Sequence, residues 1–494
     1  MVWAPRWMLF ITSSCAVACG TSITGTDAEA ELFDAGTDAR ATDASRPRDA
    51  DTFDVASPID AWLADDSADG SGDDAGRDAA GGPACVLESA DAAASVDVEV
   101  EDAGVLAWRS ESALRTSDAA PRYLGWSAAL SADGRRAILG APFDDTPHGE
   151  HAGTARVFVS REGVWEARLF AADGVADERL GYSVALSADG ERAIVGSVPR
   201  DPGERGRGHV FLRSGTTWAR EATLTAEDST SSFGGVAVAM TGGGCRALIA
   251  VERSAEGPSE VLVFARIGST WILDGSLISR EVSVGFGASV GFDGAGERAI
   301  VGAPGDDTPA GVDAGSARVF VRGPGGWLEE ARLIPSLGQA AAAFGRSVSM
   351  SSDGRWVVVG AEMYDEGALV DVGRAWIFRR EDSGWIEDAT LRHPDPDVDA
   401  YFGNSVSIDA QGDRALVGAR YDDTPAGMHA GSARVFVRAA GVWRAEAALF
   451  DPAGAANDSF GRSVALSAHG ELALVSAFYA ESTAGTAHVF QLSR

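Results

Sequence analysis

The chain of 494 residues contains no lysine: all 41 of its basic residues are arginines, against 73 acidic residues. The resulting net charge of -32 argues against a nucleic-acid partner and against an anionic membrane surface, because proteins bind both through clustered cations. Cysteine is also scarce, with four residues in all. No run of apolar residues is long enough to span a bilayer comfortably as a helix.

The first residues, MVWAPRWMLFITSSCAVACG, hold one cation, Arg6, then an apolar run over residues 7–18 and small residues before Cys19. This order is typical of a secretory signal. The ending AVAC resembles a bacterial lipoprotein signal, which implies lipidation of Cys19. Ala16 stands where that pattern usually carries leucine, so ordinary cleavage at the same bond is the alternative. We therefore expect a signal peptide over residues 1–18 and an exported lipoprotein at the outer membrane or cell surface, the alternative being a periplasmic or secreted protein.

Lipidation of Cys19 would leave Cys85 and Cys245 as candidates for a disulfide in an oxidising compartment. Two free thiols are the alternative. Cys245 occupies a turn position at which sister segments carry charged residues, so we expect its side chain to be accessible to solvent.

Residues 19–99 are rich in Asp, Ala, Gly, Ser and Thr and poor in bulky apolar side chains. Such a segment cannot bury enough surface to offset the entropy of ordering it. We expect a disordered acidic linker that holds the following domain away from a membrane.

A glycine preceded by Phe or Leu recurs seven times, at Gly125, Gly181, Gly234, Gly287, Gly345, Gly403 and Gly461. Each copy opens the same series: an alternating segment such as SVALSADG, a turn, a compact apolar run such as RAIVG, a third segment that ends on Phe, and a fourth that begins at Trp. In five of the six fourth segments that follow within the repeats, an acidic residue lies three places after the Trp and a Leu six places after it. Trp and Leu then share one face, and the acid is predicted to face water. The repeated Trp and Phe are predicted to be core residues.

The last repeat stops at Arg494, before its fourth segment. The stretch AWRSESALR near the start of the domain supplies it, because Trp108, Glu111 and Leu114 reproduce the spacing of the other fourth segments. Closing a ring in this way removes open sheet edges. We therefore predict an all-β fold over residues 100–494: one seven-bladed β-propeller whose N-terminal strand completes the last blade.

The pattern resembles the FG-GAP repeat family, the propeller module also found in integrin α chains. The Phe-Gly half is present in five repeats, with Leu124 and Leu180 substituting in two, and Gly-Ala-Pro is intact at residues 140–142 and 302–304. The resemblance implies adhesion and suggests calcium loops of the form D-x-D-x-D-G-x-x-D. The matching turns here, such as SADGRRA, lack oxygen side chains at enough alternate positions, so we predict no calcium there and no cofactor.

Two motifs, one acidic and one with histidines, are candidates for metal sites. The motif DDTP recurs with Asp144 and Asp145, Asp306 and Asp307, and Asp422 and Asp423; a turn with Asp hydrogen-bonded to backbone amides is predicted, and weak cation binding is the alternative. In HGEH, His148, Glu150 and His151 occupy positions where sister repeats carry unrelated residues, so we predict loop drift and no metal site.

No catalytic residues are predicted, since no nucleophile elbow is present and the repeated acids lie in turns or on outward strand faces. We expect a monomeric binding or adhesion module for a protein or carbohydrate ligand. The loops that differ between blades, SVPRDPGERGRGHV with Arg200, Arg205 and Arg207, and AEMYDEGALVDVG, are the first places to look for the site. The alternative is a secreted hydrolase or lyase that acts on polysaccharide at the propeller channel.

Overall fold

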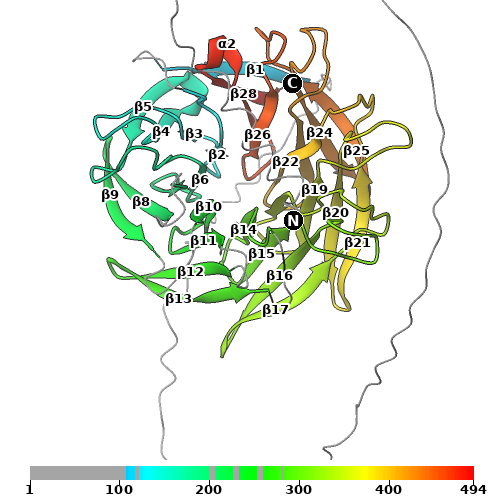
Figure 1. Cartoon of the computed structure of the whole chain (residues 1–494), viewed down its shortest axis with the longest axis horizontal. Helices are drawn as coiled ribbons and strands as arrows, with labels where there is room; N and C mark the ends of the chain where they lie inside the picture. Colours follow the sequence, from blue (N-terminus) through cyan, green and yellow to red (C-terminus); the bar gives the residue numbers. More distant parts are fainter. Residues whose placement is uncertain are drawn as a thin grey trace, which may run out of the picture. The chain divides into compact units, whose positions relative to one another are not determined.

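A computed structural model describes residues 107–116, 122–199, 206–225, 233–252, 260–279, 283 and 285–493. The predicted signal peptide over residues 1–18 and the predicted linker over residues 19–99 lie outside this part of the chain. The described residues form seven four-stranded antiparallel sheets, the blades, arranged around a ring (Figure 1). The prediction of an all-β, seven-bladed propeller is confirmed.

Each blade has its strands in sequence order from the inside of the ring to the outside, except for the last one. The innermost strands are β2 (Ala128–Leu130), β6 (Ser183–Leu186), β10 (Phe233–Met240), β14 (Val290–Phe292), β18 (Ser347–Met350), β22 (Phe402–Ile408) and β26 (Phe460–Leu466). The second strands are β3 (Arg136–Ala141), β7 (Arg192–Ser197), β11 (Arg246–Glu252), β15 (Arg298–Ala303), β19 (Trp356–Ala361), β23 (Arg414–Ala419) and β27 (Leu472–Ala477).

The third strands are β4 (Thr154–Val159), β8 (Arg207–Ser214), β12 (Glu260–Ile267), β16 (Ser316–Gly323), β20 (Arg374–Glu381), β24 (Ser432–Ala439) and β28 (Thr486–Ser493). The outermost strands are β5 (Val164–Leu169), β9 (Thr217–Leu224), β13 (Thr270–Ile278), β17 (Gly326–Leu333), β21 (Gly384–Leu391), β25 (Val442–Leu449) and β1 (Ala107–Leu114). We number the blades 1 to 7 in the order of these lists. Two short helical turns are also present, η2 (Ser160–Glu162) and α2 (Ala480–Thr483). Among the described residues no helix has the length and apolar character that crossing a membrane requires.

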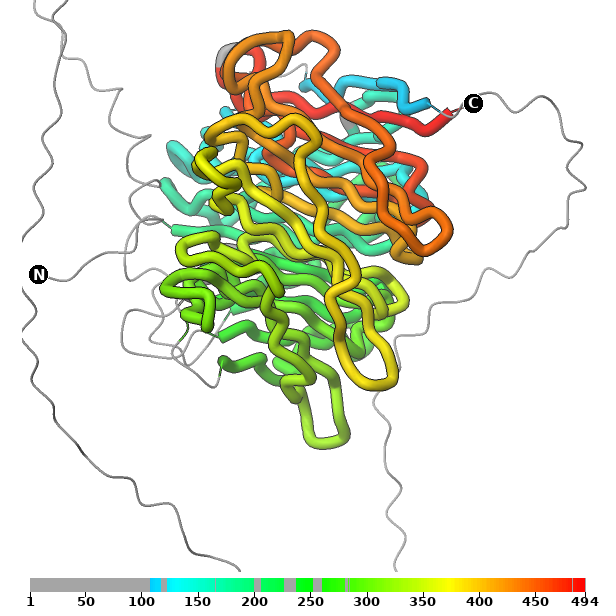
Figure 2. Tube along the Cα trace, turned by 90° about the vertical axis from the view of Figure 1, so that its right-hand side faces the viewer, coloured from blue at the N-terminus to red at the C-terminus, as the bar shows by residue number. Residues whose placement is uncertain are grey.

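The N-terminal strand β1 completes blade 7, as the sequence predicts. β1 pairs antiparallel with β28, with Trp108 opposite Leu492 and Leu114 opposite Ala487. In the side view, the blue start of the described chain lies beside the red C-terminal strand (Figure 2). Leu114 is fully buried in a cluster that also contains residues of blade 1. The two ends of the domain therefore close the ring through both hydrogen bonds and packing.

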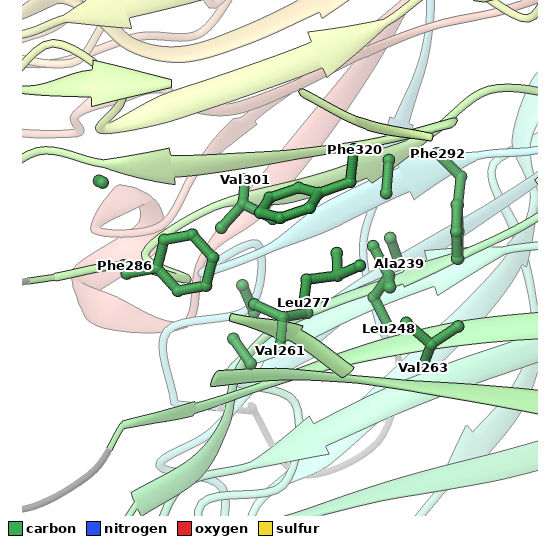
Figure 3. Packing of buried hydrophobic residues seen from close by; sticks show 13 residues of the cluster. Ala239, Leu248, Val261, Val263, Leu277, Phe286, Phe292, Val301 and Phe320 are labelled. Carbon is green, nitrogen blue, oxygen red and sulfur yellow. The ribbon is translucent and has the colours of Figure 1, made fainter. Parts of the chain in front are cut away.

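The hydrophobic core is divided into clusters, each lying between neighbouring blades. The cluster between blades 3 and 4 combines Val263 and Leu277 with Phe286 and Phe320 (Figure 3). In all seven blades the predicted third-strand Phe is buried, from Phe158 at 0% exposure to Phe264 at 6%. The repeated tryptophans described in the structure are partly buried and pack on the cluster shared with the preceding blade, as Trp327 does here. Each blade is thus stabilised mainly by its neighbours.

The Phe-Gly and Gly-Ala halves of the repeat meet where successive blades touch. Gly181, at the entrance to blade 2, has a φ of +95°, a conformation that L residues other than glycine rarely adopt. A Cβ on Gly140 of blade 1 would lie closer than 3.0 Å to the carbonyl oxygen of Gly181. The same close approach recurs between Gly302 and Gly345. Both glycines of the motif are required because two backbones come together there.

The acidic residue of each outermost strand does not behave as its alternation predicts. Every pairing of the third strand with the outermost strand contains a β-bulge, and the residue skipped is the acid three positions before the buried Leu: Glu111, Glu166, Glu221, Asp274, Glu330, Asp388 and Glu446. We call these residues the bulge acids. A bulge breaks the period of two and re-aims the side chain.

Six bulge acids point toward the next blade, with side-chain exposures between 8% and 24%. Glu330 of blade 4 accepts hydrogen bonds from Arg298 of its own blade and from Arg380 and Trp385 of blade 5. Of the seven, all in described strands, Glu111 alone is exposed. The prediction that the acid three places after the Trp faces water is therefore wrong for blades 2 to 6. Glu166 of blade 1, which directly follows its Trp and was not covered by that prediction, is buried like them. Glu446 also accepts from the Trp108 indole of β1, at 3.0 Å, which ties the closing strand to blade 6.

Candidate functional site

Two sets of loops meet at one end of the blades, which we call the loop face. The innermost strands begin at this end and the second strands finish there, so the Phe-Gly segment and the Gly-Ala segment of every repeat both lie on it. The residue that follows the Phe-Gly glycine lies close to the start of each innermost strand, on this face. It is a different residue in nearly every blade: Trp126, Tyr182, Gly235, Ala288, Arg346, Asn404 and Arg462.

Three arginines and one carboxylate gather at this face from blades 5, 6 and 7. Arg346 donates from Nε to Oε1 of Glu362 at 2.9 Å, and Arg420 donates to the other oxygen of Glu362. The Glu362 carboxylate is buried, with a side-chain exposure of 3%, while Arg346 is 39% exposed. Burial alone would raise the pKa of Glu362, but Arg420 and Arg346 outweigh it and hold that pKa below its ordinary value. Glu362 therefore stays ionised.

Aromatic rings surround the arginines. The Arg462 guanidinium carbon lies 4.5 Å from the centre of the Trp126 ring and 5.6 Å from that of Phe478. Trp126 in turn lies 5.4 Å from the Tyr182 ring. Arg420 lies over two further rings, at 4.7 Å from Tyr401 and 5.1 Å from Tyr421. Cations over ring faces at these distances are stabilised by the ring quadrupole.

Arg462 is the centre of this arrangement. Burial, together with the neighbouring cations Arg420 and Arg346, lowers the pKa of its guanidinium to about 10. Tyr182 of blade 2 and Glu362 of blade 5 also act on it. Arg462 lies in β26, the innermost strand of blade 7, and packs over Trp126 of blade 1, so it lies on the inner side of the ring. We define the axial cluster as Trp126, Tyr182, Arg346, Glu362, Arg420, Arg462 and Phe478.

The DDTP loops lie on the same face and have a structural role. The second Asp of each accepts a hydrogen bond from a backbone amide six residues on, as from His151 to Asp145 at 3.0 Å, which confirms the predicted turn. The first Asp is buried: Asp306 accepts from Ser316 at 2.6 Å and from Arg318 at 2.9 Å. Its carboxylate is therefore hydrogen-bonded to the third strand of its own blade. The sequence did not indicate this second role.

A cavity of about 300 Å³ lies beside the DDTP loop of blade 6. It is lined by His393, Asp395, Asp397, Asp422, Asp423 and Arg434, among others. Two of these residues contact each other: His393 Nε2 lies 3.2 Å from Asp422 Oδ2. Within the described ranges no group of three or more His, Cys, Asp or Glu residues is arranged to hold a metal ion.

The HGEH loop of blade 1 does not bring its three residues to one point. His148 and Glu150 are exposed, and His151 lies 3.3 Å from both Asp177 and Arg122. These are ordinary polar contacts of a loop.

Cys245 is disulfide-bonded and partly buried in the turn between β10 and β11. The other three cysteines of the chain precede residue 107 and lie outside the described residues. The pairing of Cys85 with Cys245 and the lipidation of Cys19 therefore stay predictions; peptide mapping without reduction would check the first.

Of the two variable loops predicted as places for a binding site, one lies largely outside the described residues and the other contributes to the axial cluster. In the loop of blade 2, Arg200 and Arg205 lie outside the described residues, and Arg207 lies 3.9 Å from Glu178. The loop of blade 5 contributes Glu362 to the axial cluster. The rest of the cluster was not anticipated from the sequence. The sequence does show that the residue after the invariant glycine varies between repeats. It does not show which of these residues meet, because only the closed ring brings side chains of several blades together.

Fold and site together define the class: an all-β, seven-bladed propeller with a non-repeated polar and aromatic cluster on its loop face. The family model described as "FG-GAP repeat" matches four segments of the chain, residues 164–212, 327–378, 385–436 and 443–490. Each match runs from the outermost strand of one blade through the third strand of the next, so the repeat in sequence is offset by one strand from the blade.

No curated protein matches the chain. Among the solved structures that match is the crystal structure of the RRP9 WD40 repeats, at 11% sequence identity and a TM-score of 0.49, covering 78% of this chain and 97% of that chain.

Proposed function

We propose that this chain is an exported binding module, anchored to a bacterial membrane by lipid on Cys19, whose propeller presents its loop face to a protein or carbohydrate ligand outside the cell. A propeller of FG-GAP repeats suggests a binding module, and adhesion is the role that the likeness to integrin α chains implies. The signal sequence and the acidic segment over residues 19–99 support export and a spacer between membrane and domain.

The observation that carries the proposal is the variable residue of the axial cluster. The position is flanked in every repeat by the Phe-Gly or Leu-Gly glycine and in six of seven by Ser, yet it holds Trp, Tyr, Gly, Ala, Arg, Asn and Arg in turn. A requirement of the ring itself would select the same residue in equivalent positions. Residues that differ between blades at a position where the blades converge are typical of a site for a ligand that lacks sevenfold symmetry.

The chemistry of the cluster supports binding over hydrolysis. Glycoside hydrolysis commonly uses two carboxyl groups, one of them protonated as the general acid. Glu362 is the one carboxylate of the axial cluster, and the arginines that hold it keep it ionised.

The proposal is tested in two measurements on the full chain. In a bacterial host with the lipoprotein pathway, labelled palmitate should enter the wild-type protein and not the Cys19→Ser variant; an unlabelled wild type contradicts the anchor. The purified chain is then screened against glycans and surface proteins, and a ligand should be lost when Arg346 and Arg462 are both changed to Met. A screen without any ligand contradicts the binding function.

A further inference from the structure

The axial cluster carries more positive charge than the residues around it neutralise. Three guanidiniums, from Arg346, Arg420 and Arg462, share the single carboxylate of Glu362. Both Glu362 oxygens are occupied by Arg346 and Arg420. Among the described residues, no Asp or Glu forms a salt bridge with Arg462. On a chain with a net charge of -32, this concentration of cations in one place requires an explanation.

The cluster already shows which anion it accommodates. Arg346 and Arg420 clamp the two oxygens of a carboxylate, which is the geometry that guanidinium forks favour. Arg462 is a third guanidinium of the same kind, partly buried and held by the rings of Trp126 and Phe478. A guanidinium whose position is fixed before binding loses little entropy when it pairs with an anion. A second carboxylate would complete the arrangement that Glu362 begins.

Aromatic rings next to Arg462 indicate what would bear that carboxylate. Trp126 and Tyr182 are partly exposed and lie in contact at the start of neighbouring innermost strands, with ring centres 5.4 Å apart. The C–H faces of a sugar ring pack well on such surfaces, while its carboxylate reaches the adjacent guanidinium. Ligand sites of this type combine apolar walls with a few polar groups that fix orientation.

We propose that the axial cluster binds an acidic carbohydrate, with the carboxylate of a uronic acid residue paired to Arg462 and its sugar ring against Trp126 and Tyr182. This inference rests on the proposed binding function and names its ligand class.

The test is calorimetric titration of the full chain with three probes: a galacturonic acid trimer, a neutral galactose trimer and an acidic peptide of three Asp residues. The uronate should bind and the neutral trimer should not. Arg462→Met keeps the length of the side chain and removes its charge, so uronate affinity should fall by about ten-fold or more, the usual loss for a charge-assisted pair. Arg444→Met, on the exposed side of β25, is the matched control and should bind like the wild type.

Thermal melting separates this role from a structural one. Arg462→Met loses the contacts of the cation with two rings but also removes its repulsion from Arg420 and Arg346, so its melting temperature without ligand should change little. Undiminished uronate binding by this variant, or a lower melting temperature together with retained binding, overturns the inference. Binding of the Asp peptide in place of the uronate also overturns it. If the screen finds a neutral glycan or a protein ligand while the uronate does not bind, the inference fails and the proposed function stands; if nothing binds, both fail.

Discussion

At the scale of single residues, the motif glycines have the clearest physical role. Gly345 has a φ of +94°, and a Cβ there would lie closer than 3.0 Å to the carbonyl oxygen of Ser316. The strained backbone and the collision with main-chain atoms act together, and neither can be relieved by turning a side chain. This explains why glycine persists at this position while the residue after it varies freely.

We expect Gly345→Ala to lower the free energy of unfolding by at least about 2 kcal/mol, from the conformational penalty alone. Gly325→Ala, in the neighbouring blade 4, is the control, because nothing lies within 4 Å of a Cβ there and its φ lies outside the range that excludes L residues. Denaturant melts of both variants measure the difference. Equal stability of the two would show that the blades separate enough to admit a methyl group.

At the scale of elements, the bulge in each outermost strand connects one blade to the next. Glu330 on β17 contacts Arg380 and Trp385 on blade 5 as well as Arg298 on its own blade. Burial would raise the pKa of Glu330, but hydrogen bonds from Arg298, Trp385 and Arg380 outweigh it and lower that pKa below its ordinary value of 4.5. The ionised form is therefore the one that stabilises the fold.

Glu330→Gln should lower the free energy of unfolding by about 1–3 kcal/mol at pH 7, the usual range for hydrogen bonds to a charged group. Because the pKa of Glu330 is lowered on folding, its contribution is complete above the unfolded pKa and is lost as the pH falls through the folded value. The gap between wild type and variant should therefore close below about pH 4.

Glu381→Gln is the control for this measurement, since Glu381 is 40% exposed and pairs with Arg379 at the surface. Such pairs contribute about 0–1 kcal/mol. A loss at Glu330 no greater than that at Glu381, or a gap that does not change with pH, would contradict the role of the bulge acid.

The bulge also marks the limit of what the sequence predicts about an element. Strand order, hairpin turns and the buried Phe of each third strand follow from residue types and spacing, because neighbouring strands pair locally. The direction of the acidic side chain does not follow, because one skipped residue in the pairing reverses the face that strict alternation assigns to it. Comparing the repeats does not reveal the wrong orientation, because all seven copies share the bulge.

At the scale of the whole molecule, ring closure could be predicted and the axial cluster could not. Closure could be predicted because the last repeat lacks one strand, and Trp108, Glu111 and Leu114 have the spacing of that strand. The axial cluster combines side chains from blades 1, 2, 5, 6 and 7, whose distances depend on the number of blades and on how the blades tilt. Variable loops could be named as candidates, but Arg462 lies in a strand, β26, and not in one of those loops.

Closure itself makes the last prediction. Leu114 of β1 is fully buried between blades 7 and 1, and Leu114→Ala should cost about 2–5 kcal/mol of unfolding free energy, as for other buried leucines. Arg109→Ala, on the exposed side of the same strand, is the control and should change stability little.

Deleting residues 107–116 removes the partner of β28 and the Trp108 hydrogen bond to Glu446, so it should lower the melting temperature further than Leu114→Ala does. A deletion variant that melts with the wild type would mean that the ring holds without its N-terminal strand, and a closed seven-bladed propeller would no longer describe this protein.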